Sequence, residues 1–122
     1  MTEAGRGSPP TTLIYKIVAQ PVWRAAGPIF RGAGVDLSDG FIHFSTLSQA
    51  PATAARHYAG QRDLLLVAVD AARLGDALRW EVSRGGELFP HLYGELPLSA
   101  VAWVKPLPLD ADGNHDFSGL SS

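Results

Sequence analysis

Residues 39–46, Asp-Gly-Phe-Ile-His-Phe-Ser-Thr, decide the fold, because a glycine turn there leads directly into a short strand that carries reactive side chains. Successive residues of a strand point to opposite faces, so Phe41, His43 and Ser45 are predicted to share one face. A buried polar group without a partner costs about 1–3 kcal/mol. A histidine and a serine within an apolar strand therefore need partners, and a ligand site is one way to supply them.

The length and composition of the chain predict one globular domain. The 122 residues are enough for a single core, and 46% hydrophobic with 18% charged residues is ordinary for a globular protein. We expect the domain to span residues 12–109. Residues 1–11 are rich in glycine, serine and proline and residues 110–122 are largely polar, so both ends are predicted to be flexible.

Composition alone argues against several classes of partner. The net charge of −2 and the scattered lysines and arginines give no basic surface for nucleic acid. The absence of cysteine excludes disulfides and thiol catalysis. No apolar run suits a signal peptide or approaches the roughly 20 residues of a membrane span. We therefore expect a cytoplasmic protein without a membrane partner, and the oligomeric state stays open.

The chain pattern predicts an α+β fold of about five strands with two helices in the N-terminal half. Proline near a helix start and glycine at its end place one helix between Pro21 and Gly27 and a second between Ser48, its N-cap, and Gly60. Residues 64–69 are apolar throughout, which indicates a strand covered on both faces. The other expected strands are residues 13–19, 41–45, 78–83 and 99–104.

Two further segments carry specific expectations. Residues 28–38 are predicted to form a long loop, and such loops inside a compact domain are often functional. In residues 78–83 the alternation predicts that Leu78, Trp80 and Val82 point inward. Trp23 and Trp103 are expected in the core, and Arg56, His57 and His115 on the surface.

For the polar residues of the decisive strand, a structural and a functional role are both open. His43 is either a core histidine bonded to a backbone carbonyl or an acid–base or ligand-orienting residue. Ser45 and Thr46 either cap the following helix or contact a substrate hydroxyl. Two later patches raise the same alternatives.

Glu81 shares a strand face with Arg79, so the two could form a surface pair worth under about 1 kcal/mol. A carboxylate fixed on a strand can also stabilise a developing positive charge. His91 and Tyr93 lie in a segment stiffened by Pro90 and Gly94, which suits a binding wall or a structural corner. His43, Glu81 and His91 lack the close spacing typical of metal ligands, so no metal is expected.

The motifs at residues 39–45, 79–81 and 89–98 together resemble the small bacterial family DUF952, and the likeness extends from residue 14 to about residue 104. The resemblance implies an ADP-ribosyltransferase-like fold, in which a small split β-sheet, antiparallel or mixed, holds NAD in a cleft. It places the first-strand ribose contact near Tyr15 or Lys16, the hydroxyl-bearing strand at residues 43–46, and the catalytic glutamate at Glu81 or Glu95.

Two functions follow as hypotheses. In the first, the protein is an NAD-processing or ADP-ribosyltransferase-like enzyme that carries out glycosyl transfer, with Glu81 and His43 as catalytic residues and NAD as a possible cofactor. In the second, it is a non-catalytic metabolite-binding or protein-interaction module of the same fold. The expected partner is a nucleotide-like small molecule. The expected substrate-binding residues are Tyr15, Asp39, Ser45, Thr46, Arg79, His91 and Tyr93.

Overall fold

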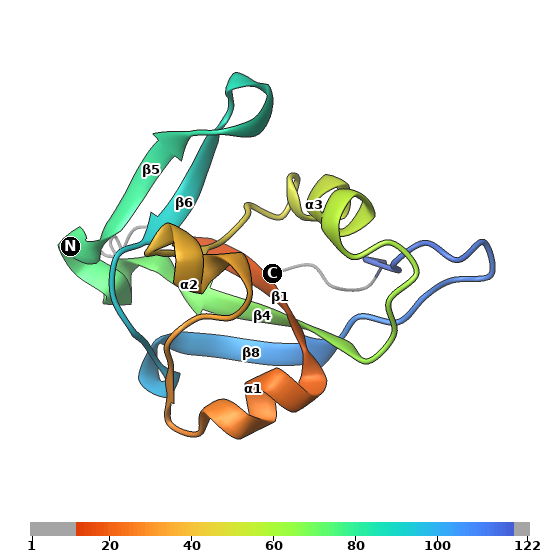
Figure 1. Ribbon diagram of the computed structural model, residues 1–122, viewed down its shortest axis with the longest axis horizontal. Coiled ribbons are helices and arrows are strands. Elements are labelled where there is room, and N and C mark those ends of the chain that lie inside the picture. The colour runs from red at the N-terminus through yellow and green to blue at the C-terminus, as the bar shows by residue number, and fades with distance from the viewer. Residues whose placement is uncertain (1–11, 119–122) are drawn as a thin grey trace, which may run out of the picture.

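The computed structural model describes residues 12–118 and confirms the α+β class, with antiparallel pairing in every sheet (Figure 1). The helices are α1 (Gln20–Ala26), α2 (Val35–Asp39) and α3 (Ala50–His57), with short 3₁₀ segments η1 (Ala71–Ala77), η2 (Arg84–Gly86) and η3 (Leu98–Ala100). The strands are β1 (Leu13–Ala19), β2 (Ile29–Phe30), β3 (Ile42–His43), β4 (Leu64–Asp70), β5 (Leu78–Val82), β6 (Leu88–Leu92), β7 (Leu96–Pro97) and β8 (Val101–Pro106).

The sheet β1-β4-β8 forms the centre of the domain, and its middle strand is buried on both faces, as predicted. Along β4, side chains alternate between two apolar clusters. Leu65, Val67 and Val69 join the cluster that includes Phe30 and Ile42. Leu64, Leu66 and Ala68 join the second cluster, which includes Ala54 of α3. The continuous apolar run is therefore required by burial on both sides of the sheet.

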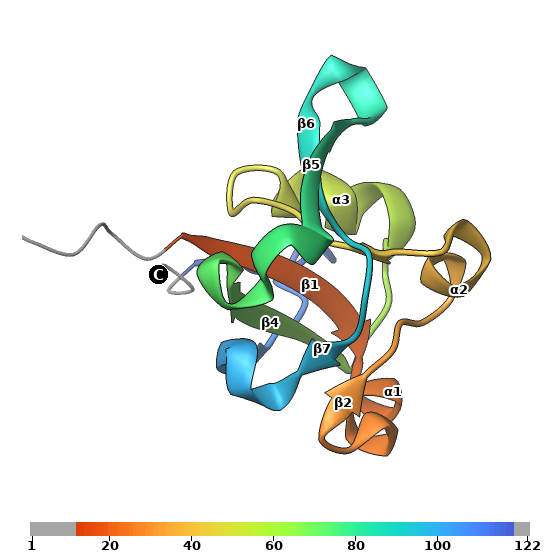
Figure 2. The same ribbon diagram turned by 90° about the vertical axis from the view of Figure 1, so that its left-hand side faces the viewer.

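The second three-stranded sheet has the order β3-β6-β5, and its β5–β6 hairpin projects from the body of the domain (Figure 2). In its register, His43 lies opposite His91, and His91 lies opposite Arg79. Residues opposite each other on neighbouring strands point to the same face. A bridge between Tyr15 and Ser45 joins this sheet to β1. The topology thus brings the reactive residues of three distant segments to one face.

The inward orientation predicted for Trp80 and Val82 is wrong. Leu78, at the base of the hairpin, packs against the core. Trp80 is 42% exposed and Val82 is 70% exposed. The alternation itself is present, but the hairpin extends beyond the body of the domain, so its apolar face has no layer to cover it.

Two local predictions also need correction. Residues 28–38 are not a simple loop, because they contain β2 and most of α2. The carboxylate of Asp36 accepts hydrogen bonds from the backbone N–H groups of Ala33 and His43, which organises this segment. The second long helix begins at Ala50 with Gln49, not Ser48, as N-cap. The Ser48 hydroxyl instead contacts that of Thr46 at 3.2 Å.

The remaining predictions concern the two tryptophans and the ends of the chain. Trp23 and Trp103 are partly buried at the margins of the two apolar clusters rather than fully inside them. Asp110 organises a turn by accepting N–H groups of Asp112 and Asn114. Residues 1–11 and 119–122 lie outside the described residues, so the flexibility of the ends stays a prediction. Within residues 12–118, no helix has the length and apolarity needed to cross a membrane.

Candidate functional site

A cavity of about 650 Å³ lies alongside β1, between α2 and α3, and reaches β6 at His91. Its volume falls in the range of small-molecule sites. The wall includes apolar and aromatic side chains, among them Val18, Phe44 and Phe89. A smaller set of polar residues also lines it: Tyr15, Lys16, Asp36, Asp39, His43, Ser45, Arg56 and His91.

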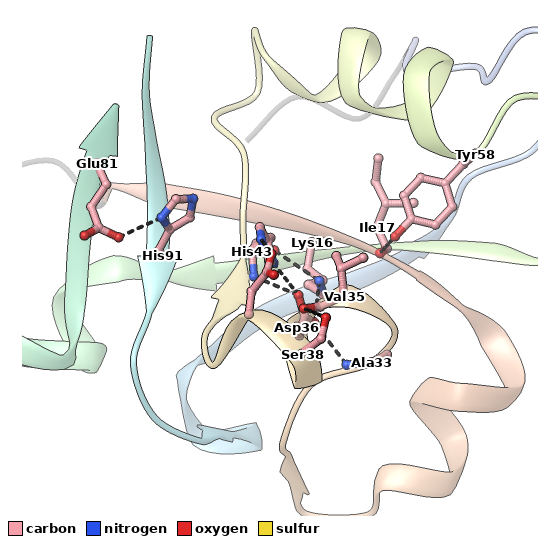
Figure 3. A network of polar contacts seen from close by, with 11 residues as sticks. Lys16, Ile17, Ala33, Val35, Asp36, Ser38, His43, Tyr58, Glu81 and His91 are labelled. Carbon is pink, nitrogen blue, oxygen red and sulfur yellow. Dashed lines mark hydrogen bonds and ion pairs between the residues drawn. The ribbon is translucent and has the colours of Figure 1, made fainter. Parts of the chain in front are cut away.

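At the base of the cavity, Lys16, Asp36 and His43 form one polar network (Figure 3). Lys16 Nζ lies 2.9 Å from Asp36 Oδ2 and donates to the backbone carbonyl of His43 at 3.1 Å. Asp36 Oδ1 lies 2.6 Å from His43 Nδ1. Lys16 and Asp36 are 6% and 3% exposed, so this network connects β1, α2 and β3 in the protein interior.

Burial and neighbouring charges shift the pKa values of Asp36 and Lys16 in opposite directions. Burial alone would raise the pKa of Asp36, but the hydrogen bond with His43 and the charge of Lys16 outweigh it and lower the pKa to about 2. Burial also lowers the pKa of Lys16, and the nearby carboxylate of Asp36 only partly offsets this effect. Asp36 is therefore ionised over the whole neutral range.

His43 lies between two carboxylates of α2. Its Nδ1 faces Asp36 and its Nε2 lies 3.1 Å from Asp39 Oδ2. A carboxylate only accepts hydrogen bonds, so both contacts are hydrogen bonds when both ring nitrogens carry protons. In that form His43 is a cation whose charge is balanced locally.

A second polar cluster lies on the projecting hairpin. Glu81 Oε1 is 2.8 Å from His91 Nδ1 and accepts the hydroxyl hydrogen of Tyr93 at 2.7 Å. The hydrogen bonds with His91 and Tyr93 lower the pKa of the Glu81 carboxyl, and the bond with Glu81 raises the pKa of Tyr93. The ring of Phe41 packs against His43 and His91, with centroid distances of 4.5 and 4.3 Å, and so links the two clusters.

The structure brings most, but not all, of the predicted site residues to the cavity. Tyr15, Asp39, His43, Ser45 and His91 line it. The buried hydroxyl of Ser45 lies 3.0 Å from that of Thr53. His43 and Ser45 line one cavity, as their predicted shared face requires, but Phe44, predicted on the opposite face, lines it as well.

The other predicted site residues do not line the cavity. Glu81 contacts His91 and accepts the hydroxyl hydrogen of Tyr93, but neither Glu81 nor Tyr93 is among the residues that line the cavity. The guanidinium of Arg79 lies over the Tyr93 ring, 5.4 Å from its centroid. Thr46 accepts the N–H of Gln49 ahead of α3, which corresponds to the helix-start alternative. A catalytic role for Glu81 stays a prediction. Glu81 is connected to the cavity by its contact with His91, which lines it.

Sequence reasoning assigned no site role to Asp36 or Arg56, and it considered Lys16 only through the family resemblance. A lysine in the middle of the apolar strand 13–19 was the available signal, because a buried lysine needs a partner. Arg56 is exposed, as predicted, but it also lines the cavity. Among residues 12–118, no three His, Asp or Glu side chains are grouped so that they could hold a metal ion.

Comparison with known proteins identifies the family. The model of a family described as "Protein of unknown function (DUF952)" matches residues 17–104. This chain belongs to the DUF952 family. The match confirms the resemblance in the sequence motifs. No curated protein matches the chain.

Solved structures of protein CC0527 from Caulobacter crescentus share the fold of this DUF952 protein. The crystal structure is 51% identical with a TM-score of 0.83, and the match covers 87% of this chain and 95% of that one. The solution NMR structure is 48% identical with a TM-score of 0.80, over 90% and 97% of the two chains. The described fold is therefore that of an experimentally determined relative.

Proposed function

We propose that this DUF952 protein binds a small, phosphate-bearing, nucleotide-like molecule in the cavity, with NAD as the first candidate ligand. The observation that carries the proposal is the charge of Arg56 on the cavity wall. The other charges of the wall are paired, since Lys16 contacts Asp36, and His43 contacts Asp36 and Asp39. Within the described residues, Arg56 forms no hydrogen bond or ion pair, so its guanidinium is available to an anion.

The rest of the wall suits the other parts of a nucleotide. Phe44, Phe89 and Tyr58 offer apolar and aromatic surface for a base. Ser45 and His91 also line the cavity and offer polar atoms to a ligand. A site with a largely apolar wall and a few convergent polar groups is typical of small-molecule binding.

Isothermal titration with NAD, ADP-ribose and AMP tests the proposal. We expect heat of binding from at least one of the three and an affinity about tenfold lower for Arg56→Gln, because a charge-assisted hydrogen bond to phosphate is lost. Arg24→Gln is the matched control, because Arg24 is an exposed arginine of α1 that does not line the cavity. No heat and no thermal shift with any of the three ligands at millimolar concentration would remove the proposal.

The second candidate function is NAD processing by an ADP-ribosyltransferase-like enzyme. It is favoured by the contact of Glu81 with His91, because this contact couples a carboxylate to a residue of the cavity wall. The two three-stranded sheets, joined by the bridge between Tyr15 and Ser45, support a split-sheet fold of this type. A cytoplasmic location belongs to the same proposal.

The Glu81→Gln variant separates the two candidates. If the protein is an enzyme, we expect NAD consumption, measured as nicotinamide release, to fall sharply in this variant while NAD binding persists. A binding module predicts that the wild-type protein binds NAD without consuming it. The measurements are nicotinamide release by chromatography and NAD binding by calorimetry on the same preparations.

A further inference from the structure

Among the described residues, one nitrogen of the His91 imidazole has a hydrogen-bond partner and the other has none. The residue is 6% exposed and lines the cavity. Its Nδ1 lies 2.8 Å from Glu81 Oε1. Its Nε2 has no hydrogen-bond partner among the described residues. Buried polar atoms are almost always satisfied, so an orphaned ring nitrogen at a cavity wall points to a ligand.

Glu81 determines which nitrogen of His91 carries the proton. A carboxylate accepts hydrogen bonds and donates none, so the short contact requires a proton on Nδ1. The hydroxyl of Tyr93 donates to the same oxygen of Glu81 at 2.7 Å and holds the carboxylate in place. In the neutral imidazole, Nε2 is then a bare acceptor. Figure 3 shows Glu81 on one side of the His91 ring and the second ring nitrogen on the side away from it.

We propose that His91 Nε2 binds a hydroxyl group of the ligand, with Glu81 and Tyr93 as positioning residues that keep this nitrogen an acceptor. The inference rests on the proposed function and specifies its ligand. An unprotonated acceptor repels an anionic oxygen, so the ligand must present a donor here and its anionic group elsewhere, at Arg56. A sugar phosphate carries both groups. The class of ligand is therefore a molecule with a sugar hydroxyl near a phosphate.

The charged groups around His91 agree with an acceptor role for its Nε2. His43 lies opposite His91 on β3, and the two rings are edge-on with centroids 5.4 Å apart. The ring nitrogens of His43 contact the carboxylates of Asp36 and Asp39. Arg79 lies opposite His91 on β5 and is positioned over the Tyr93 ring. Glu81 is thus the acidic group in contact with the imidazole of His91.

Nitrogen-15 NMR of the histidine side chains tests the first half of the inference on the full chain without ligand. At a pH at which His91 is neutral, we expect its spectrum to show a protonated Nδ1 and a bare Nε2. Glu81→Gln is expected to mix the two tautomers, whereas Glu95→Gln leaves them unchanged because Glu95 is an exposed partner of Arg31. A protonated Nε2 in the wild-type protein overturns the inference.

Titration with ADP-ribose and with inorganic pyrophosphate tests the second half. We expect ADP-ribose to shift the Nε2 resonance of His91 and pyrophosphate to leave it in place, and we expect His91→Phe to bind ADP-ribose about tenfold more weakly. If ADP-ribose shifts signals at Arg56 but not at Nε2, or if pyrophosphate shifts Nε2 equally, the inference is overturned while the proposed function stands. Absence of any shift with either probe overturns the inference, and the proposed function is overturned with it when NAD and AMP also give no heat of binding.

Discussion

The ammonium of Lys16 and the carboxylate of Asp36 lie 2.9 Å apart in the interior of the domain. Lys16 comes from the central sheet and Asp36 from α2, and the carboxylate also contacts His43 on the third element, β3. A buried charge is costly unless it is paired. The position of His43 at the cavity therefore depends on the ion pair behind it, and loss of either partner affects both stability and the site.

We expect Asp36→Asn to destabilise the fold by about 3–5 kcal/mol, because it leaves the buried charge of Lys16 without its partner. The double variant Lys16→Met with Asp36→Asn should be more stable than the single variant, since no uncompensated charge remains. Urea unfolding measures both free energies. Glu95→Gln is the control, and its exposed pair with Arg31 should contribute no more than about 1 kcal/mol. A double variant no more stable than Asp36→Asn would contradict the pairing argument.

Stability should fall in acid through the titration of Asp36. Its folded-state pKa of about 2 is below the ordinary value of 3.8, so the unfolded chain takes up this proton more readily. The contribution is fully present above about pH 4 and is lost as the pH falls through about 2; at roughly 1.4 kcal/mol per pKa unit it is worth about 2 kcal/mol. Urea unfolding at a series of pH values measures it. An equally steep acid decline in Asp36→Asn would show that other groups cause it.

The raised pKa of Tyr93 should depend on Glu81. Because the raised pKa reflects chiefly the hydrogen bond with the Glu81 carboxylate, Glu81→Gln is expected to shift Tyr93 ionisation to lower pH. The ultraviolet absorbance of tyrosinate, taken as the difference from a matched Tyr93→Phe protein, isolates this residue. The pKa of Tyr58, raised chiefly by burial, should not respond and serves as an internal control. An unchanged Tyr93 titration would argue against the contact.

Substitutions on the projecting hairpin should be tolerated far better than substitutions in the core. Trp80→Thr is expected to change the unfolding free energy by no more than about 0.5 kcal/mol, because the indole is 42% exposed on the uncovered face. Phe30→Ala should cost about 3–5 kcal/mol, because Phe30 is 1% exposed in the main apolar cluster. Thermal and urea unfolding compare the two. A large loss in Trp80→Thr would mean that another surface covers the hairpin.

Local sequence patterns predicted those features that depend on neighbouring residues. The apolar run 64–69 required a strand covered on both faces, and β4 is one. Proline and glycine correctly located α1, since one fixes φ and the other accepts a positive φ, here +69° at Gly27. The alternation around His43 indicated a polar face on a short strand. In each case the physical cause acts over a few residues along the chain.

Only the tertiary structure decided which polar groups meet. The pairing of Lys16 with Asp36 joins segments 20 residues apart, and no local pattern encodes it. The position of Glu81 behind His91 follows from the register of β5 and β6 and from the projection of their hairpin, which also exposes Trp80. Sequence alone thus determined the strands at residues 13–19, 64–69 and 78–82, the position of α1 and the family motifs. Long-range packing determined the composition of the cavity, because charge pairing and burial depend on contacts between distant segments.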